Sequence, residues 1–152
     1  MAQKDILLKK TIEYLKSQNW RYSVEEDTIR FSLSLKSKIS SCSMEIHVFE
    51  YGILARGLCP LKATKDVYGN VVEYLTRANY GLKWGGFEFD YHDGEICFRD
   101  FLTAKEGVPS LKDIERIVDT PSMMMQRYGD GLVKSLMGFG DPERDIEAAE
   151  EN

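Results

Sequence analysis

The sequence predicts an α+β domain in which helices pack on an antiparallel sheet. Three observations carry this prediction: helical spacing of apolar residues near both ends of the chain, strict apolar–polar alternation in the middle, and an Asp-Gly pair between two further alternating stretches. The expected order of elements is α-β-β-β(β)-α-β-β-α, in which one strand of the first group is short.

The first half of the chain predicts a helix followed by a meander of strands. Residues 4–16 place Leu8, Ile12 and Leu15 on one stripe, which is typical of an amphipathic helix. A short strand is expected at 21–24. Residues 28–35 and 42–48 then alternate with period two, and residues 53–59 form a less regular third stretch. Short turns between these stretches favour antiparallel pairing of neighbours.

The second half predicts a helix, a hairpin and a long closing helix. Asp66 is the expected N-cap of the first of these helices, which Gly69 weakens. Asp93-Gly94 suits a two-residue type I′ turn. That turn would place the following residues opposite each other: Phe89 and Phe98, Tyr91 and Ile96, Glu88 and Arg99, His92 and Glu95. Ser110 is the expected N-cap of the last helix, which Pro121 should break or kink.

Length and charge predict one domain over 1–140 and a flexible acidic tail over 141–152. The 152 residues suit one hydrophobic core. The tail carries the whole net charge of −5, and the remaining body is neutral without a basic stripe, which argues against nucleic-acid binding. No apolar stretch is long enough for a membrane span or a signal peptide, so we expect a cytoplasmic protein that does not bind membranes.

Candidate chemistry lies on the polar side of the alternating stretches. Glu88, Asp90 and His92 project together and, with Glu45 and His47, could bind a metal ion or small molecule or support hydrolysis. Ordinary cross-strand pairing of charges is the competing interpretation. No nucleophile elbow or phosphate-binding loop occurs. We therefore expect no catalytic residues, no metal and no cofactor, and we expect Cys42, Cys59 and Cys97 to be buried thiols.

Two groups of apolar residues are candidates for contact with a partner, although each could instead belong to the core. The methionines suit an adaptable surface, and the aromatic residues between the first helix and the sheet suit a peptide contact. The candidates are Trp20, Tyr22, Met123, Met124, Met125 and Tyr128.

The stretch 75–110 resembles the signature of the YbjN family of bacterial proteins. In that family an asparagine near the end of the second helix precedes a Gly-x-Phe-Glu strand, and an Asp-Gly-Glu turn and an Arg-bearing strand ending in Leu follow. The matching residues here are Asn79, Gly86-Phe87-Glu88, Asp93-Gly94-Glu95, Arg99 and Leu102. The opening Asn19-Trp20-Arg21-Tyr22 and the closing helix with Tyr128 also fit, whereas the middle strands at 42–59 depart most from the family.

This resemblance implies the fold of type III secretion chaperones, which are small, acidic, dimeric and non-enzymatic proteins that bind extended segments of clients. YbjN proteins are described as regulators of sensory transduction and offer no catalytic motif to transfer. We therefore expect a non-catalytic homodimer that binds a protein or peptide client.

Overall fold

A computed structural model describes residues 2–151 and contains a six-stranded antiparallel sheet and four α-helices. The helices are α1 (Gln3–Ser17), α2 (Tyr68–Asn79), α3 (Leu111–Leu136) and α4 (Pro142–Glu150), and a 3-10 turn, η1 (Lys65–Val67), precedes α2. The strands are β1 (Ser23–Glu25), β2 (Thr28–Ser34), β3 (Ser41–Phe49), β4 (Gly52–Leu58), β5 (Gly86–Phe89) and β6 (Ile96–Thr103). The predicted α+β class and order of elements up to α3 are therefore confirmed.

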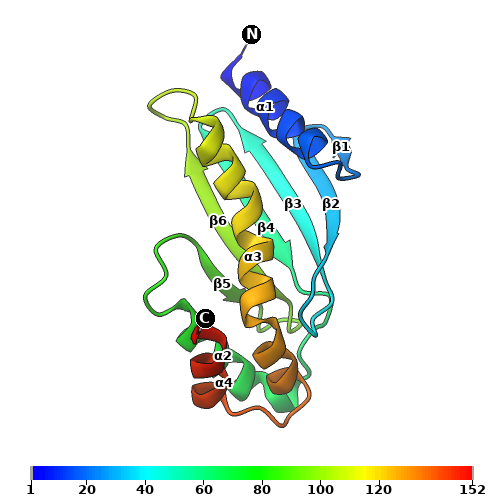
Figure 1. The fold of residues 1–152 in the computed structure, drawn as a ribbon, viewed down its shortest axis with the longest axis vertical. Helices are drawn as coiled ribbons and strands as arrows, with labels where there is room; N and C mark the ends of the chain where they lie inside the picture. The colour runs from blue at the N-terminus through cyan, green and yellow to red at the C-terminus, as the bar shows by residue number, and fades with distance from the viewer. Residues whose placement is uncertain (1, 152) are drawn as a thin grey trace.

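The sheet has the strand order β1-β2-β3-β4-β6-β5. Figure 1 shows that α1 and α3 cover the same face of this sheet, whereas α2 and α4 lie together at one end of the molecule. Side chains on the covered face, such as Ile46 and Ile53, are fully buried. The opposite face, which we call the open face, exposes Arg30, Ser43 and Arg99 to solvent. The alternation of the sequence thus correctly predicts which side chains form the core.

Helix α3 runs without interruption through Pro121, so of the predicted break or kink at this residue, the break is wrong. Pro121 is buried and faces β4, where a Cβ atom on Gly57 would lie 2.9 Å from the Pro121 Cβ. The proline ring therefore packs where the sheet has no side chain. At the helix start, Ser110 is the predicted N-cap, because its hydroxyl accepts a hydrogen bond of 3.1 Å from the Asp113 amide.

Two local predictions in the middle of the chain need correction. Val67 is the N-cap of α2 and makes no side-chain capping bond, while Asp66 lies in η1 and accepts a 2.5 Å hydrogen bond from the Thr64 hydroxyl. The hairpin register is shifted by two residues: Phe87 faces Phe98, and Glu88 faces Cys97. Phe87, Phe89 and Phe98 keep their predicted face, since a shift of two preserves the alternation. Tyr91 and His92 lie in the turn, so their predicted pairing with Ile96 and Glu95 is wrong.

The hairpin turn is longer than a two-residue type I′ turn. The Asp90 amide donates to the Glu95 carbonyl at 2.9 Å, which leaves residues 91–94 as the connection. Gly94 has φ +79°, and a Cβ atom there would collide with the Ala63 carbonyl oxygen. The turn is therefore held against residues before α2, a contact that the local sequence does not reveal.

The predicted flexible acidic tail is wrong for residues 142–150, which form α4. The Asp141 side chain caps this helix by accepting a hydrogen bond from the Arg144 amide at 3.2 Å, and Pro142 occupies its first turn. Ile146 is only 7% exposed, and α4 packs against α2 and α3. The Tyr128 hydroxyl also donates to the Glu150 carboxylate at 2.7 Å.

All three cysteines are buried and unpaired, as predicted. Cys42 lies in β3 on the covered face, Cys59 follows β4, and Cys97 lies in β6 on the open face. Burial raises the pKa of Cys42 to about 12 and the pKa of Cys97 to about 11, so both remain protonated thiols at neutral pH.

Candidate functional site

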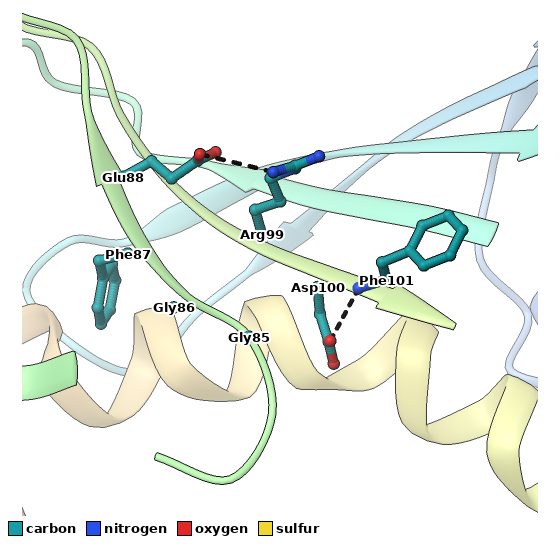
Figure 2. A pocket seen from close by; sticks show the side chains of 7 residues that line it. All are labelled: Gly85, Gly86, Phe87, Glu88, Arg99, Asp100 and Phe101. Atoms are coloured by element: carbon teal, nitrogen blue, oxygen red, sulfur yellow. Dashed lines mark hydrogen bonds and ion pairs between the residues drawn. The ribbon is translucent and has the colours of Figure 1, made fainter. Parts of the chain in front are cut away.

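The candidate site lies where β5 ends beside the longer strand β6. Strand β5 pairs only with residues 96–99 of β6, whereas β4 pairs with residues 97–103. Residues 100–103 of β6 therefore have a neighbouring strand on one side only. We call the place where β6 extends beyond β5 the step. Beside it, a surface hollow of about 370 Å³ is lined by both strands and by Gly85 (Figure 2).

Gly85 explains why β5 begins only at Gly86 and does not extend further along β6. Its φ is +68°, and a Cβ atom here would lie 2.5 Å from the Arg99 carbonyl oxygen. The backbone therefore crosses close to β6 in a conformation that favours glycine. Gly85 therefore allows the tight entry of the chain into the hairpin.

On the covered side of the step, Asp100 forms a buried ion pair with α3. Its carboxylate lies 2.7 Å from the Arg116 guanidinium and also accepts a 2.8 Å hydrogen bond from the Phe101 amide. The Arg116 guanidinium lies 4.8 Å from the centre of the Trp84 ring. These contacts hold the loop before Gly85 near α3 and away from the end of β6.

On the open face at the same end of the sheet, three aromatic side chains form a cluster: Phe49, Tyr51 and Phe101. The rings of Phe49 and Tyr51 stack with centroids 5.4 Å apart, and Tyr51 lies 6.0 Å from Phe101. The Phe101 ring covers Gly52, where any Cβ atom would collide with it. Tyr51 remains 49% exposed and Phe101 40% exposed, so the cluster is available to solvent.

The rest of the open face carries a ladder of ion pairs across β2, β3 and β4. Glu45 lies between two arginines, at 3.2 Å from Arg30 and 3.3 Å from Arg56. Arg56 also lies 3.2 Å from Glu95, which follows the hairpin turn. Cross-strand pairing therefore accounts for these charges, although Glu95 pairs with Arg56 and not with the predicted His92.

The residues proposed for metal binding or hydrolysis do not all come together. Glu88 and Asp90 line a second hollow of about 280 Å³ with Arg56, Glu95 and Cys97, but His92, Glu45 and His47 do not line it. His92 lies exposed in the turn, and His47 is hydrogen-bonded to Thr28 at 3.1 Å.

No three His, Cys, Asp or Glu side chains within residues 2–151 are placed to hold a metal ion together. Binding of a small molecule or a metal ion at Glu88, Asp90 and His92 stays a prediction. Elemental analysis and a thermal shift with divalent cations, repeated with His92→Ala, would test it.

The structure separates the six predicted partner-binding residues into two groups. Met125 and Tyr128 are fully buried, so the prediction that they contact a partner is wrong for these two. Tyr128 contacts Phe87 and receives the Tyr74 hydroxyl at its carbonyl oxygen, which makes it part of the core. Helical spacing places these residues on the buried side of α3.

The other four residues keep some access to solvent. Met123 is 59% exposed, and Met124 is partly buried. Trp20 and Tyr22 are also partly buried, and the Trp20 ring stacks on Phe31 at 5.5 Å. Partner contact at these four residues stays a prediction.

Sequence reasoning missed the aromatic cluster and the step between β5 and β6. The alternation assigns Phe49 and Phe101 to the open face, which is a signal because bulky apolar residues are unusual among its polar neighbours. The step itself depends on the hairpin register, which the predicted two-residue turn placed incorrectly.

Comparison with known proteins supports a fold and no closer relationship. No protein-family profile matches the chain, and a search of curated proteins found no match. Among solved structures, the fold is similar to that of YbjN from E. coli, described as a candidate transcription regulator, with a TM-score of 0.57 and 9% sequence identity. The match covers 78% of this chain and 85% of that chain. The chain therefore has a YbjN-like α+β fold.

None of the helices within residues 2–151 combines the length and the hydropathy of a membrane span.

Proposed function

We propose that the chain is a non-catalytic binding module for a polypeptide partner, with a chaperone-like or regulatory role in the bacterial cytoplasm. The aromatic cluster of Phe49, Tyr51 and Phe101 carries this proposal. Exposed aromatic side chains on a rigid sheet supply large contact areas at low entropic cost, and such residues are enriched where proteins bind each other.

The electrostatic character of the surface supports a polypeptide partner over a nucleic acid. The chain has a net charge of −5, and the arginines of the open face are paired with carboxylates. Phosphate binding needs a surplus of lysine and arginine on one surface. A regulator of this kind would act through protein contacts, as the resemblance to secretion chaperones implies.

Photo-crosslinking in the native cells tests this proposal. Benzoylphenylalanine in place of Tyr51 should form a covalent adduct with a defined second polypeptide. The same substitution at Tyr91 is the matched control, because this tyrosine is 65% exposed but lies in the hairpin turn, beyond the opposite end of β6. Absence of an adduct at Tyr51, or identical adducts from both positions, would contradict the proposal.

Homodimer formation is a separate part of the proposal and needs its own measurement. One chain has a mass of 17.4 kDa, and light scattering of the purified protein should give twice this mass. A monomeric mass would remove the dimer from the proposal and leave the crosslinking result to decide partner binding.

A further inference from the structure

The backbone at the end of β6 has hydrogen-bonding groups that no strand within residues 2–151 faces. The Cys59 amide donates to Ile96, and the Ala104 amide donates to Tyr51, both in register with the β4–β6 pairing. Because bonded positions alternate along an antiparallel ladder, the even-numbered residues of β6 bond to β4. The backbone groups of Phe101 and Thr103 therefore point away from β4, to the side where β5 has ended.

The remaining edges of the sheet are better protected than this one. At the outer edge of β5, the Asn79 side chain bonds to both the amide and the carbonyl of Phe87, at 2.6 and 3.0 Å. At the other edge, β1 is only three residues long and ends in Glu25. Short strands and charged residues are common protection against unwanted pairing. Among residues 2–151, no strand covers the segment 101–103, where the Phe101 amide bonds to the neighbouring Asp100 carboxylate.

The space beside this segment continues the line of β5. The chain before Gly85 turns toward α3, and the 370 Å³ hollow extends along Gly85–Glu88 and Arg99–Phe101. Figure 2 shows Phe101 and Asp100 on opposite sides of β6 at this place. A strand that entered here would extend the existing β5–β6 ladder and would place alternate side chains against the Phe101 ring.

We propose that the end of β6 binds an extended segment of a partner polypeptide by adding it to the sheet as a continuation of the β5 line. The recognised chemistry is a bare peptide backbone, which bonds at Phe101 and Thr103, together with an apolar side chain that packs on Phe101. This inference rests on the proposed function and specifies its mode of binding. The carbonyl of the incoming strand would replace the Asp100 carboxylate as acceptor for the Phe101 amide.

Peptides selected from a random display library on the wild-type protein are the probe for this mode. Their affinity is measured by fluorescence anisotropy for the wild type and for two variants at Thr103. Thr103→Pro removes the backbone N–H at a position where an edge strand tolerates proline. Thr103→Val keeps the N–H and replaces only the hydroxyl, which accepts a 3.3 Å bond from the Lys105 amide, with a methyl group, so it is the matched control. We expect affinity about tenfold weaker for Thr103→Pro and unchanged for Thr103→Val.

Two further measurements on the wild-type protein keep the test independent of how well Thr103→Pro folds. N-methylation of the peptide at successive positions should weaken binding with a period of two, because only alternate amides face β6. Bound peptide should also slow hydrogen exchange at the Thr103 amide and leave the Leu102 amide, already bonded to β4, unchanged.

The possible results separate this inference from the proposed function. Equal affinity for the wild type and Thr103→Pro, equal losses in both variants, or no enriched peptide would overturn binding at the β6 edge. Conversion of a dimer to a monomer by Thr103→Pro would also overturn it, because a second copy of the chain would then occupy the edge. Crosslinking at Tyr51 would still support polypeptide binding after any of these results.

Discussion

The Asn79 side-chain amide pairs with the backbone of Phe87 as a neighbouring strand would. Its oxygen accepts from the Phe87 amide at 2.6 Å, and its nitrogen donates to the Phe87 carbonyl at 3.0 Å. One side chain at the end of α2 thus fixes the position of the helix relative to the sheet edge. This contact explains why an asparagine is suited to this position.

Asn79→Ala should therefore destabilise the protein. It leaves two partly buried backbone groups without partners, which we expect to lower the free energy of unfolding by about 1–3 kcal/mol. Urea denaturation measures this loss. Asn70→Ala is the control, because Asn70 is exposed on the same helix, and its replacement should change stability by less than about 0.5 kcal/mol. Equal effects of both variants would contradict the role of Asn79.

The two ion pairs beside the hollow should differ in strength. Glu88 and Arg99 lie 3.8 Å apart and are half exposed, whereas Asp100 and Arg116 lie 2.7 Å apart and Asp100 is buried. Double-mutant cycles to alanine should give a coupling of about 0.2–1 kcal/mol for the first pair. Loss of Arg116 alone should lower the free energy of unfolding by about 3–5 kcal/mol, because the buried Asp100 carboxylate would keep its bond from the Phe101 amide but lose its cationic partner. Equal coupling energies for the two pairs would contradict this difference in strength.

Stability should depend on pH through Asp119, which accepts a 2.6 Å hydrogen bond from the Tyr14 hydroxyl. Burial raises the pKa of Asp119 above its ordinary value of 3.8, although the bond from Tyr14 opposes this shift. The folded state therefore binds more protons than the unfolded state just above pH 3.8, and stability falls as the pH rises through this window. Asp119→Asn should remove this contribution in urea titrations, and an unchanged slope would argue against it.

Two glycine-to-alanine substitutions should have opposite effects. At Gly57, the new methyl group would meet the Pro121 Cβ and the Cys42 Sγ at 2.9 Å, and both neighbours are buried. We expect a loss of about 1–3 kcal/mol from overpacking. At Gly69, nothing lies within 4 Å, so alanine should stabilise α2 by about 0.5–1 kcal/mol. Thermal unfolding of both variants checks the contrast, and a tolerated Gly57→Ala would show that α3 can move away from β4.

Packing of α4 can be tested at its buried isoleucine. Ile146→Ala should lower the free energy of unfolding by about 2–4 kcal/mol, since the side chain is almost fully buried. Glu147→Ala, at an exposed position of the same helix, is the control. A flexible tail would make both substitutions neutral, so a neutral Ile146→Ala would restore the original prediction for these residues.

The sequence predicts the faces of the sheet well and its pairing poorly, for a physical reason. Alternation with period two determines which side chains share a face, as the burial of Ile29, Met44 and Ile46 confirms. A shift of two residues leaves this pattern intact, so alternation could not exclude the register in which Phe87 faces Phe98. The turn is instead held by Ala63, which lies far from it in the sequence.

The acidic composition of the last residues concealed a helix whose signals were present. Asp141 and Pro142 form a standard helix start, and Ile146 and Ala149 lie three residues apart on one side. The candidate site was harder to predict, because the step between β5 and β6 requires the correct register and the turn at Gly85. The exposure of Met123 and the burial of Met125 likewise depend on how α3 is oriented on the sheet.

The burial of the cysteines has a practical consequence. Thiol reagents modify thiolates, and the raised pKa values of Cys42 and Cys97 keep both side chains protonated while the chain is folded. Because both side chains are also buried, alkylation requires an opening that brings a thiol into water. Mass spectrometry of alkylated peptides would then give separate opening rates for Cys97, next to β5, and for Cys42, in the central strand β3. The unmodified protein thus contains internal probes of its local unfolding, without any engineered label.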